Sequence, residues 1–215
     1  MSDTELRKYS DGEKENYRIS YGILKAFLTP VGLAMYRPRL HGNEKIPKEG
    51  GVILALNHRC NGDPAFICLG TKRMIHFLAK KELFEGSFSW FFRLGGTIPV
   101  DRVHGDKKAM ATAEDILHKG GIVGIFPEGT RNRTEEPILP LKFGAVRIAQ
   151  KTGVPIIPVV SVGPYKPFGT PIDVYYCDPM YVAEGDDLEK ANKKLRSIMT
   201  EVYVKNNENK GTVTK

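Results

Sequence analysis

A regular alternation of short apolar runs with segments of helical character is the feature that most restricts the fold of this chain. Three runs are apolar almost throughout: Val52–Leu56, Ile122–Phe126 and Ile156–Val160. Runs of this kind are typical of strands that are buried on both faces of a sheet. The segment Lys107–His118 is expected to be a helix closed by the glycine pair that begins at Gly120. Because strands alternate with helices, we predict an α/β fold, a mainly parallel sheet flanked by helices.

The remaining elements are expected to continue this pattern. Asp63 should open a helix as its N-cap, with Pro64 as the first helical residue. Residues 37–42 should lead into a Pro/Gly loop at 43–51, and the tail at 206–215 should fray. The other expected strands are Met74–Leu78, Thr97–Val100 and Val174–Cys177, and the other expected helices are Glu82–Leu94, Phe143–Thr152 and Leu188–Val204.

The chain is predicted to divide at residue 36, with an N-terminal region at 1–36 and the α/β domain at 37–215. Apolar and aromatic residues dominate residues 17–36, and Thr29 followed by Pro30 fits a helix N-cap and first helical position. We therefore expect an N-terminal amphipathic helical hairpin. It would either cover the core of the domain or lie in the surface of a membrane. Its place outside the α/β pattern favours the membrane.

The charge and composition narrow the class of partner. A net charge of +7, from 32 Lys and Arg against 25 Asp and Glu, favours a partner that carries phosphate groups. No nucleic-acid-binding motif is recognisable, so we expect a membrane or a phosphorylated substrate instead of a nucleic acid. The three cysteines and five histidines have no disulfide or metal-ligand pattern, so no metal is expected. The sequence has no run of the roughly 20 consecutive apolar residues that a membrane-spanning helix needs. Its first residues are polar and do not resemble a secretory signal. We therefore expect the protein at the cytoplasmic face of a membrane, peripheral or monotopic.

The segment NHRCNGDP, residues 57–64, directly follows the first apolar run and contains a candidate general base. His58 and Asp63 are five residues apart, and Gly62 permits a tight turn between them. The carboxylate can then accept a hydrogen bond from one imidazole nitrogen while the other nitrogen acts as a base. Two simpler readings remain open: Asp63 caps a helix and nothing more, or His58 is an ordinary loop histidine.

Two further segments contain arginines that follow strands. FPEGTRNR, residues 126–133, follows an apolar run, and its Arg131 suits a phosphate because the guanidinium can bind two oxygens at once. Glu128 in the same turn could accept hydrogen bonds from a polyol or hold the arginine in place. LGGTIPVDR, residues 94–102, ends at Arg102. Taken singly, an ordinary turn with a solvated ion pair is the favoured explanation of FPEGTRNR, and a turn with a surface arginine is the simpler reading of LGGTIPVDR.

Together and in this order, these segments resemble the sequence blocks of the glycerolipid acyltransferase family, with its lysophosphatidic acid acyltransferases the nearest in length and arrangement. The Asn-His-four-residue-Asp block corresponds to residues 57–63, the glycine-rich turn, strand and arginine to 95–102, and a proline-containing strand to 154–159. Phe-Pro-Glu-Gly-Thr-Arg is present intact at 126–131 and is the most specific part. The resemblance covers about residues 38–162.

The resemblance implies an enzyme, a 1-acylglycerol-3-phosphate O-acyltransferase of phospholipid biosynthesis. His58, oriented by Asp63, would be the catalytic base. The glycerol-phosphate end of the lipid would be held by residues of the later blocks, namely Arg102, Glu128, Gly129, Thr130, Arg131 and Lys142. No resident cofactor is implied, because the acyl donor is itself a substrate, either acyl-coenzyme A or acyl carrier protein.

Two local features add to this expectation. The family usually has a serine two residues after the histidine, whereas this chain has Cys60, which we interpret as a small turn residue and not as a nucleophile. In the segment 83–94, neighbouring aromatic residues on a helix would point about 100° apart and cannot all face one core. Some of Phe88, Trp90, Phe91 and Phe92 are therefore expected to line an acyl-chain groove or enter the membrane.

The function predicted from the sequence is transfer of a fatty acyl chain from a thioester to the 2-hydroxyl of lysophosphatidic acid, giving phosphatidic acid. Expected partners are the phospholipid membrane surface, lysophosphatidic acid and the thioester donor. One alternative keeps the chemistry and changes the acceptor to glycerol-3-phosphate or another lysophospholipid. A more distant alternative is a non-catalytic basic protein that binds membranes.

Overall fold

The computed structural model describes residues 21–23, 25, 26, 30, 33–87, 89–101 and 106–211. Within these residues the strands form one sheet in the order β1-β7-β6-β2-β5-β3-β4. Neighbouring strands from β6 to β4 run parallel, whereas β7 pairs with β6 in the antiparallel direction and β1 runs parallel to β7. The strands are β1 (Arg39–His41), β2 (Val52–Leu56), β3 (Ile75–Lys80), β4 (Ile98–Val100), β5 (Ile122–Ile125), β6 (Ile156–Val162) and β7 (Asp173–Tyr176).

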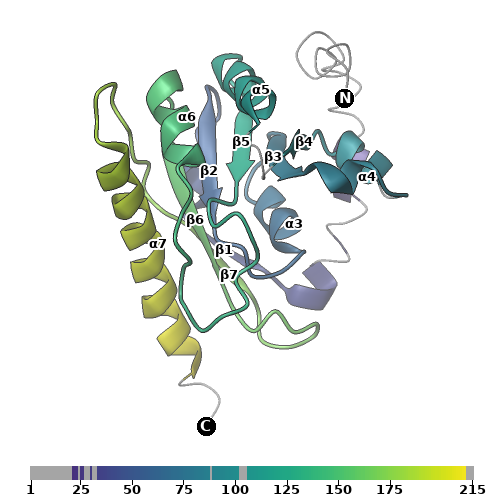
Figure 1. The fold of residues 1–215 in the computed structure, drawn as a ribbon. Helices are drawn as coiled ribbons and strands as arrows, with labels where there is room; N and C mark the ends of the chain where they lie inside the picture. Colours follow the sequence, from purple (N-terminus) through teal and green to yellow (C-terminus); the bar gives the residue numbers. More distant parts are fainter. Residues whose placement is uncertain are drawn as a thin grey trace.

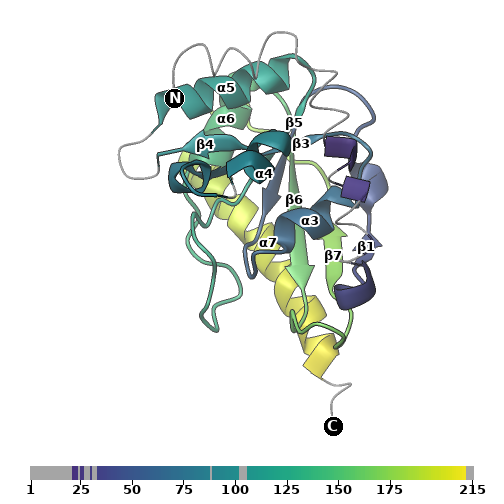
Figure 2. The ribbon, with the colours of Figure 1, turned by 90° about the vertical axis from the view of Figure 1, so that its right-hand side faces the viewer.

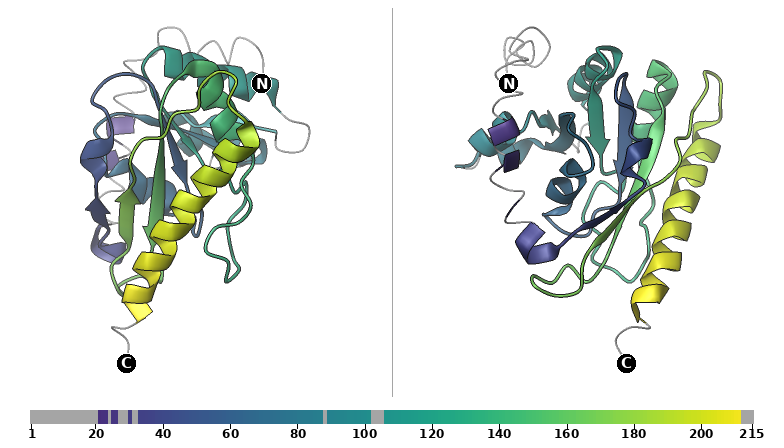
Figure 3. Two further views of the ribbon diagram at one scale, coloured as in Figure 1. Left: turned by 90° about the vertical axis from the view of Figure 1, so that its left-hand side faces the viewer. Right: turned by 180° about the vertical axis from the view of Figure 1, so that it is seen from behind.

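Helices cover both faces of the sheet (Figures 1 and 2). Helices α5, α6 and α7 lie on one face, and Figure 3 shows α7 running obliquely across it, packed against β6. Helix α3 lies on the other face, and α4 lies beside the edge formed by β3 and β4. The bounds are α3 (Asp63–Cys68), α4 (Ser89–Leu94), α5 (Lys107–His118), α6 (Gly144–Thr152) and α7 (Leu188–Gly211), with 3-10 helices η1 (Asn43–Lys45) and η2 (Lys81–Phe84).

The position of β2 in the middle of the sheet explains why its sequence is apolar throughout. Ile53 and Ala55 belong to the core under α5, α6 and α7, whereas Val52, Leu54 and Leu56 belong to the core on the α3 side. All five residues are fully buried, as expected of a strand with helices on both faces. Each large apolar side chain of this kind contributes roughly 1.5–3 kcal/mol on burial, so burying β2 favours folding strongly.

The predicted mainly parallel sheet flanked by helices is confirmed, and Val52–Leu56 and Lys107–His118 have the bounds expected from the sequence. The helix expected at Glu82–Leu94 is instead the short helices η2 and α4, because a turn at residues 85–87 interrupts it. Strand β1 lies where a connecting segment was expected. Its three residues form a strand because they pair with β7, a contact between distant parts of the chain. The expected fraying of residues 206–211 is wrong, because α7 continues to Gly211.

The N-terminal helical hairpin falls largely outside the described residues. Those described within 17–36 are helical where they occur, and the division of the chain at residue 36 stays a prediction. Within the described residues, no helix is both long enough and apolar enough to cross a bilayer.

Gly124 in β5 is expected to be essential for close packing on the α3 side. It lies opposite Phe77 in the sheet register, and a Cβ atom added there would meet the Phe77 ring at 2.5 Å. We expect Gly124→Ala to lower the free energy of unfolding by about 1–3 kcal/mol, because the Phe77 ring must move from its packed position against Phe126. Urea denaturation would measure this change.

The matched control is Gly144→Ala at the start of α6, where an added Cβ would meet nothing within 4 Å. Alanine should be neutral there or stabilise by up to about 1 kcal/mol, since glycine loses more backbone entropy on folding. Equal stability of the Gly124→Ala variant and the unmodified protein would contradict the packing argument.

Candidate active site

The candidate site lies where the loops after β2 and β5 meet. These strands are parallel neighbours, so their carboxyl ends reach the same edge of the sheet. The loop after β2 contains His58 and leads into Asp63, the first residue of α3, and the loop after β5 contains Glu128 and Arg131. Two of the sequence segments with unusual polar residues are therefore brought together by strand pairing.

His58 and Asp63 form the expected pair. The imidazole Nδ1 lies 2.9 Å from Asp63 Oδ2, and the same oxygen accepts the backbone N–H groups of Arg59 at 2.7 Å and Cys60 at 2.9 Å. Because this oxygen is already an acceptor, Nδ1 donates to it, and the free lone pair of the ring is on Nε2. Asp63 is fully buried and the His58 side chain is 18% exposed, so the imidazole reaches solvent while the carboxylate does not.

Asp63 does not have the helix-capping role expected from the sequence. Gly62 is the N-cap of α3 and Asp63 is the first helical residue, with Pro64 after it. The carboxylate points back to the preceding loop and accepts that loop's amides, so it is not available to the amides of α3. This excludes the simpler reading that Asp63 serves as a cap alone.

Glu128 joins the two loops through the backbone. Its Oε1 accepts the N–H of His58 at 2.8 Å, and its Oε2 accepts the N–H of Leu139 at 2.9 Å. The side chain is only 5% exposed, and burial raises the pKa of its carboxyl group, although these two amide donors act in the opposite direction. A second link runs from the N–H of Asn132 to the carbonyl of His58 at 2.7 Å. The backbone of His58 is thus held by two contacts from the loop after β5.

Asn57 fixes the start of the loop after β2 on its other side. Its amide Nδ2 donates to the carbonyl of Ser161 at 3.0 Å, while its Oδ1 accepts the Ser161 N–H at 2.8 Å. Ser161 belongs to β6, which also neighbours β2, and both side chains are buried. Sequence reasoning did not identify Ser161, since 104 residues separate it from Asn57.

A cavity of about 580 Å³ opens beside His58. Its wall is mainly apolar and comes largely from the segment between the two motifs, including Ile75, Phe77, Phe91 and Phe92. His58, Thr130 and Arg131 line the cavity as well. The expectation that part of the aromatic segment lines a groove is thus met by Phe91 and Phe92. Trp90 is 55% exposed, and Phe88 lies outside the described residues.

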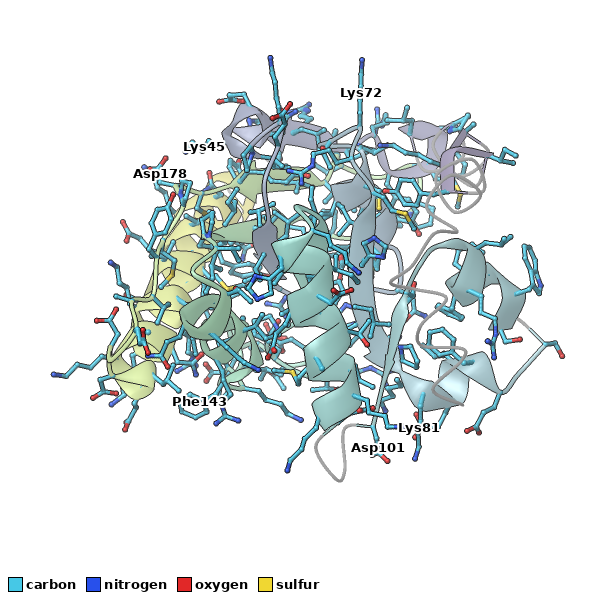
Figure 4. All side chains as sticks on the ribbon, turned by 90° about the horizontal axis from the view of Figure 1, so that it is seen from above. Lys45, Lys72, Lys81, Asp101, Phe143 and Asp178 are labelled. Carbon is cyan, nitrogen blue, oxygen red and sulfur yellow. The ribbon has the colours of Figure 1, made fainter. Side chains whose placement is uncertain are left out.

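Two more of the sequence-predicted binding residues, Gly129 and Lys142, lie against each other in the loop after β5 and the segment that follows it. Gly129 has φ +70°, a conformation that favours glycine, and the Lys142 side chain lies against it so closely that an added Cβ would meet Cε at 2.7 Å. Arg102 lies outside the described residues. The described part of its segment ends at Asp101, which pairs with Lys81 at 2.7 Å at the edge of the sheet (Figure 4).

Cys60 behaves as the turn residue expected from the sequence. Its Sγ accepts the N–H of Gly62 at 3.2 Å and donates to Asp63 Oδ1 at 3.6 Å. Burial, together with the nearby Asp63 charge, raises the pKa of the thiol to about 12. The group is therefore a neutral thiol near pH 7, which makes it a poor nucleophile.

The region that contains these site residues is similar to known proteins. A family model described as Acyltransferase matches residues 37–162. A 1-acyl-sn-glycerol-3-phosphate acyltransferase of Bacillus subtilis (strain 168) is 36% identical over 152 residues, which cover 69% of this chain and 72% of that protein. A protein of the same name from Streptococcus pneumoniae is 31% identical over 185 residues, covering 78% of this chain and 67% of that protein.

A similar fold occurs in a solved structure. The crystal structure of the 1-acyl-sn-glycerophosphate (LPA) acyltransferase PlsC from Thermotoga maritima matches with a TM-score of 0.71 and 24% sequence identity. The match covers 90% of this chain and 82% of that one. At this level of identity the likeness supports the α/β architecture.

The raised thiol pKa leads to a reactivity prediction. At pH 8, Cys60 should react with iodoacetamide far more slowly in the folded protein than in urea, because the thiolate is the reactive form. Mass spectrometry of peptides after timed labelling would measure the rate at each cysteine. Cys60 labelling in the folded protein as fast as in urea would contradict a neutral, hydrogen-bonded thiol.

Proposed function

Because this chain belongs to the acyltransferase family, we propose that it transfers a fatty acyl chain from an acyl thioester to the 2-hydroxyl of lysophosphatidic acid, forming phosphatidic acid. The observation that carries the proposal is the His58–Asp63 pair at the side of a mainly apolar cavity. The names of the two relatives cited above, from Bacillus subtilis and Streptococcus pneumoniae, support this acceptor.

In the first step, Nε2 of His58 removes the proton of the acceptor hydroxyl as its oxygen attacks the thioester carbonyl carbon. The C=O π bond gives way to a C–O bond, and the carbonyl oxygen becomes an oxyanion. The imidazolium that forms is stabilised by Asp63, whose buried carboxylate is 2.9 Å from Nδ1.

In the second step, the tetrahedral intermediate collapses and the C–S bond breaks. The thiol leaving group takes the proton from His58, which restores the neutral base. The acyl chain passes directly from sulfur to oxygen, so no acyl-enzyme forms, in keeping with the high pKa of the Cys60 thiol. The donor is acyl-coenzyme A or acyl carrier protein, and the reaction as proposed needs no resident cofactor.

Substrate binding divides between the two sides of His58. The apolar wall that contains Phe77, Phe91 and Phe92 suits an acyl chain. The glycerol-phosphate end is proposed to bind Thr130, Arg131 and Lys142 around the Gly129 turn, because guanidinium and ammonium groups recognise phosphate. Arg102 is proposed as a further phosphate ligand for the same reason. Both oxygens of Glu128 accept backbone amides, so its contribution to binding is exerted at least in part through the loops that it joins.

A peripheral or monotopic position at the cytoplasmic face of a membrane follows from the substrates. Both the acceptor lipid and the product reside in the bilayer, and a net charge of +7 favours an anionic surface.

The assay is transfer of labelled acyl from acyl-coenzyme A, or from acyl carrier protein, to lysophosphatidic acid, with glycerol-3-phosphate as a second acceptor. Wild type should form phosphatidic acid, and Asp63→Asn should lower kcat by about 10⁴-fold because the imidazole is no longer held in the correct tautomer. His58→Ala should lower kcat at least as much.

The matched control is a second histidine–aspartate pair. His41 Nε2 lies 2.8 Å from Asp173 Oδ1 on strands β1 and β7, and neither residue lines the cavity. His41→Ala should therefore keep wild-type turnover. Product from glycerol-3-phosphate alone would change the proposed acceptor, and full activity of the His58→Ala variant would refute the proposed base.

Membrane binding is tested apart from catalysis by flotation with anionic and neutral liposomes. Wild type and His58→Ala should float equally with anionic liposomes, because the substitution leaves the basic surface unchanged. Flotation with neither liposome would contradict the peripheral position. Flotation of a wild type that transfers no acyl chain would favour a non-catalytic membrane-binding protein.

A further inference from the structure

Arg59, the residue next to the proposed base, connects three separate parts of the fold. Its Nη1 donates to the carbonyl of Thr134 at 2.9 Å, and its Nη2 donates to the carbonyl of Glu136 at 3.1 Å. The same Nη2 donates to the hydroxyl of Tyr203 in α7 at 2.7 Å, and the guanidinium lies 4.7 Å from the centre of the Tyr203 ring. The side chain is therefore held by the loop after β5 and by the C-terminal helix.

The backbone of the same residue contacts the catalytic pair. The N–H of Arg59 donates to Asp63 Oδ2 at 2.7 Å, the oxygen that also accepts from His58 Nδ1. An anchored Arg59 side chain restricts rotation of its own peptide group. Any movement of that peptide would disturb the carboxylate that orients the imidazole.

Arg59 is poorly placed to bind substrate directly. It does not line the cavity, whereas its neighbour His58 does. Both terminal nitrogens already donate to backbone carbonyls, and one also donates to Tyr203. A phosphate would have to displace these contacts. The charge has an internal use instead, because Arg59 helps to lower the pKa of Glu128 against the effect of burial.

We infer that Arg59 is a positioning residue, which transmits the packing of α7 and of the loop at 134–137 to the His58–Asp63 pair. The inference rests on the proposed acyl transfer, which it deepens by making the C-terminal helix part of the apparatus that orients the base. Tyr203 would then be the contact through which α7 acts.

The chain offers a matched control in Arg73. Its guanidinium also donates to backbone carbonyls, those of Pro47, Gly50 and Gly120. Gly50 and Gly120 precede β2 and β5, so this arginine joins the opposite end of the same two strands. Arg73→Met should lower stability without altering the base.

The kinetic test compares Arg59→Met, Arg59→Lys, Tyr203→Phe and Arg73→Met in the acyl transfer assay. Arg59→Met should lower kcat by roughly 100-fold with little change in KM for lysophosphatidic acid, the loss expected from a displacement of about 1 Å. Arg59→Lys should be intermediate, because lysine keeps the charge without the planar fork. Tyr203→Phe, which keeps the ring, should lose up to about tenfold, and Arg73→Met should keep the wild-type kcat.

A second readout needs no substrate. Nitrogen-15 NMR of the imidazole of His58 should show one tautomer with the proton on Nδ1 in wild type and in Arg73→Met. It should show a mixture of tautomers in Arg59→Met. Tyr203→Phe keeps the test usable where Arg59→Met fails to fold.

The outcomes separate the inference from the proposed function. A raised KM with unchanged kcat in the Arg59 variants would overturn the inference, because it would make Arg59 a substrate ligand. A loss of stability alone, with wild-type kcat and one tautomer, would overturn it too. If wild type transfers no acyl chain, the proposed function fails, and the tautomer measurement alone decides whether Arg59 orients His58.

Discussion

The site depends on a single buried carboxylate. Asp63 has no exposed surface, and a charge in such a place is costly unless hydrogen bonds compensate it. Here the imidazole of His58, the amides of Arg59 and Cys60, and the Cys60 thiol all donate to it. These donors come from one short loop, so satisfying the carboxylate also determines the path of that loop. The orientation of the His58 imidazole is therefore a consequence of burying Asp63 next to it.

A second buried carboxylate ties this loop to its neighbour. Glu128 accepts amides from His58 and from Leu139, and so joins the segments that follow β2 and β5. Asn57 makes the corresponding connection to β6 through Ser161. The loop that carries His58 is thus held on both sides, by the loop after β5 and by β6. Neither contact involves Nε2 of His58, which leaves this nitrogen free to face the cavity.

The sequence predicted the elements and contacts that depend on residues close together in the chain. It did not predict the contacts between residues that are far apart in the chain. Strand β2 and helix α5 were predicted with correct bounds because their apolar patterns are local. The His58–Asp63 contact was predictable because five residues separate the two in one loop. The Arg59–Tyr203 contact spans 144 residues and no pattern signals it, and β1 exists only through its pairing with β7. The capping role expected of Asp63 was wrong, because its carboxylate accepts hydrogen bonds from the amides of the loop before the helix.

The order of the strands explains how a linear series of motifs becomes a site with two sides. The segments with His58 and Arg131 are far apart in the chain, but the sheet order places β2 beside β5, so their loops touch. The residues between them fold outward through α3, β3 and α4 and supply the apolar wall with Phe77 and Phe91. His58 therefore stands between a polar loop with cationic side chains and an apolar cavity. These two environments match the opposite polarities of a glycerol-phosphate and an acyl chain, the two parts of the substrates proposed for this site.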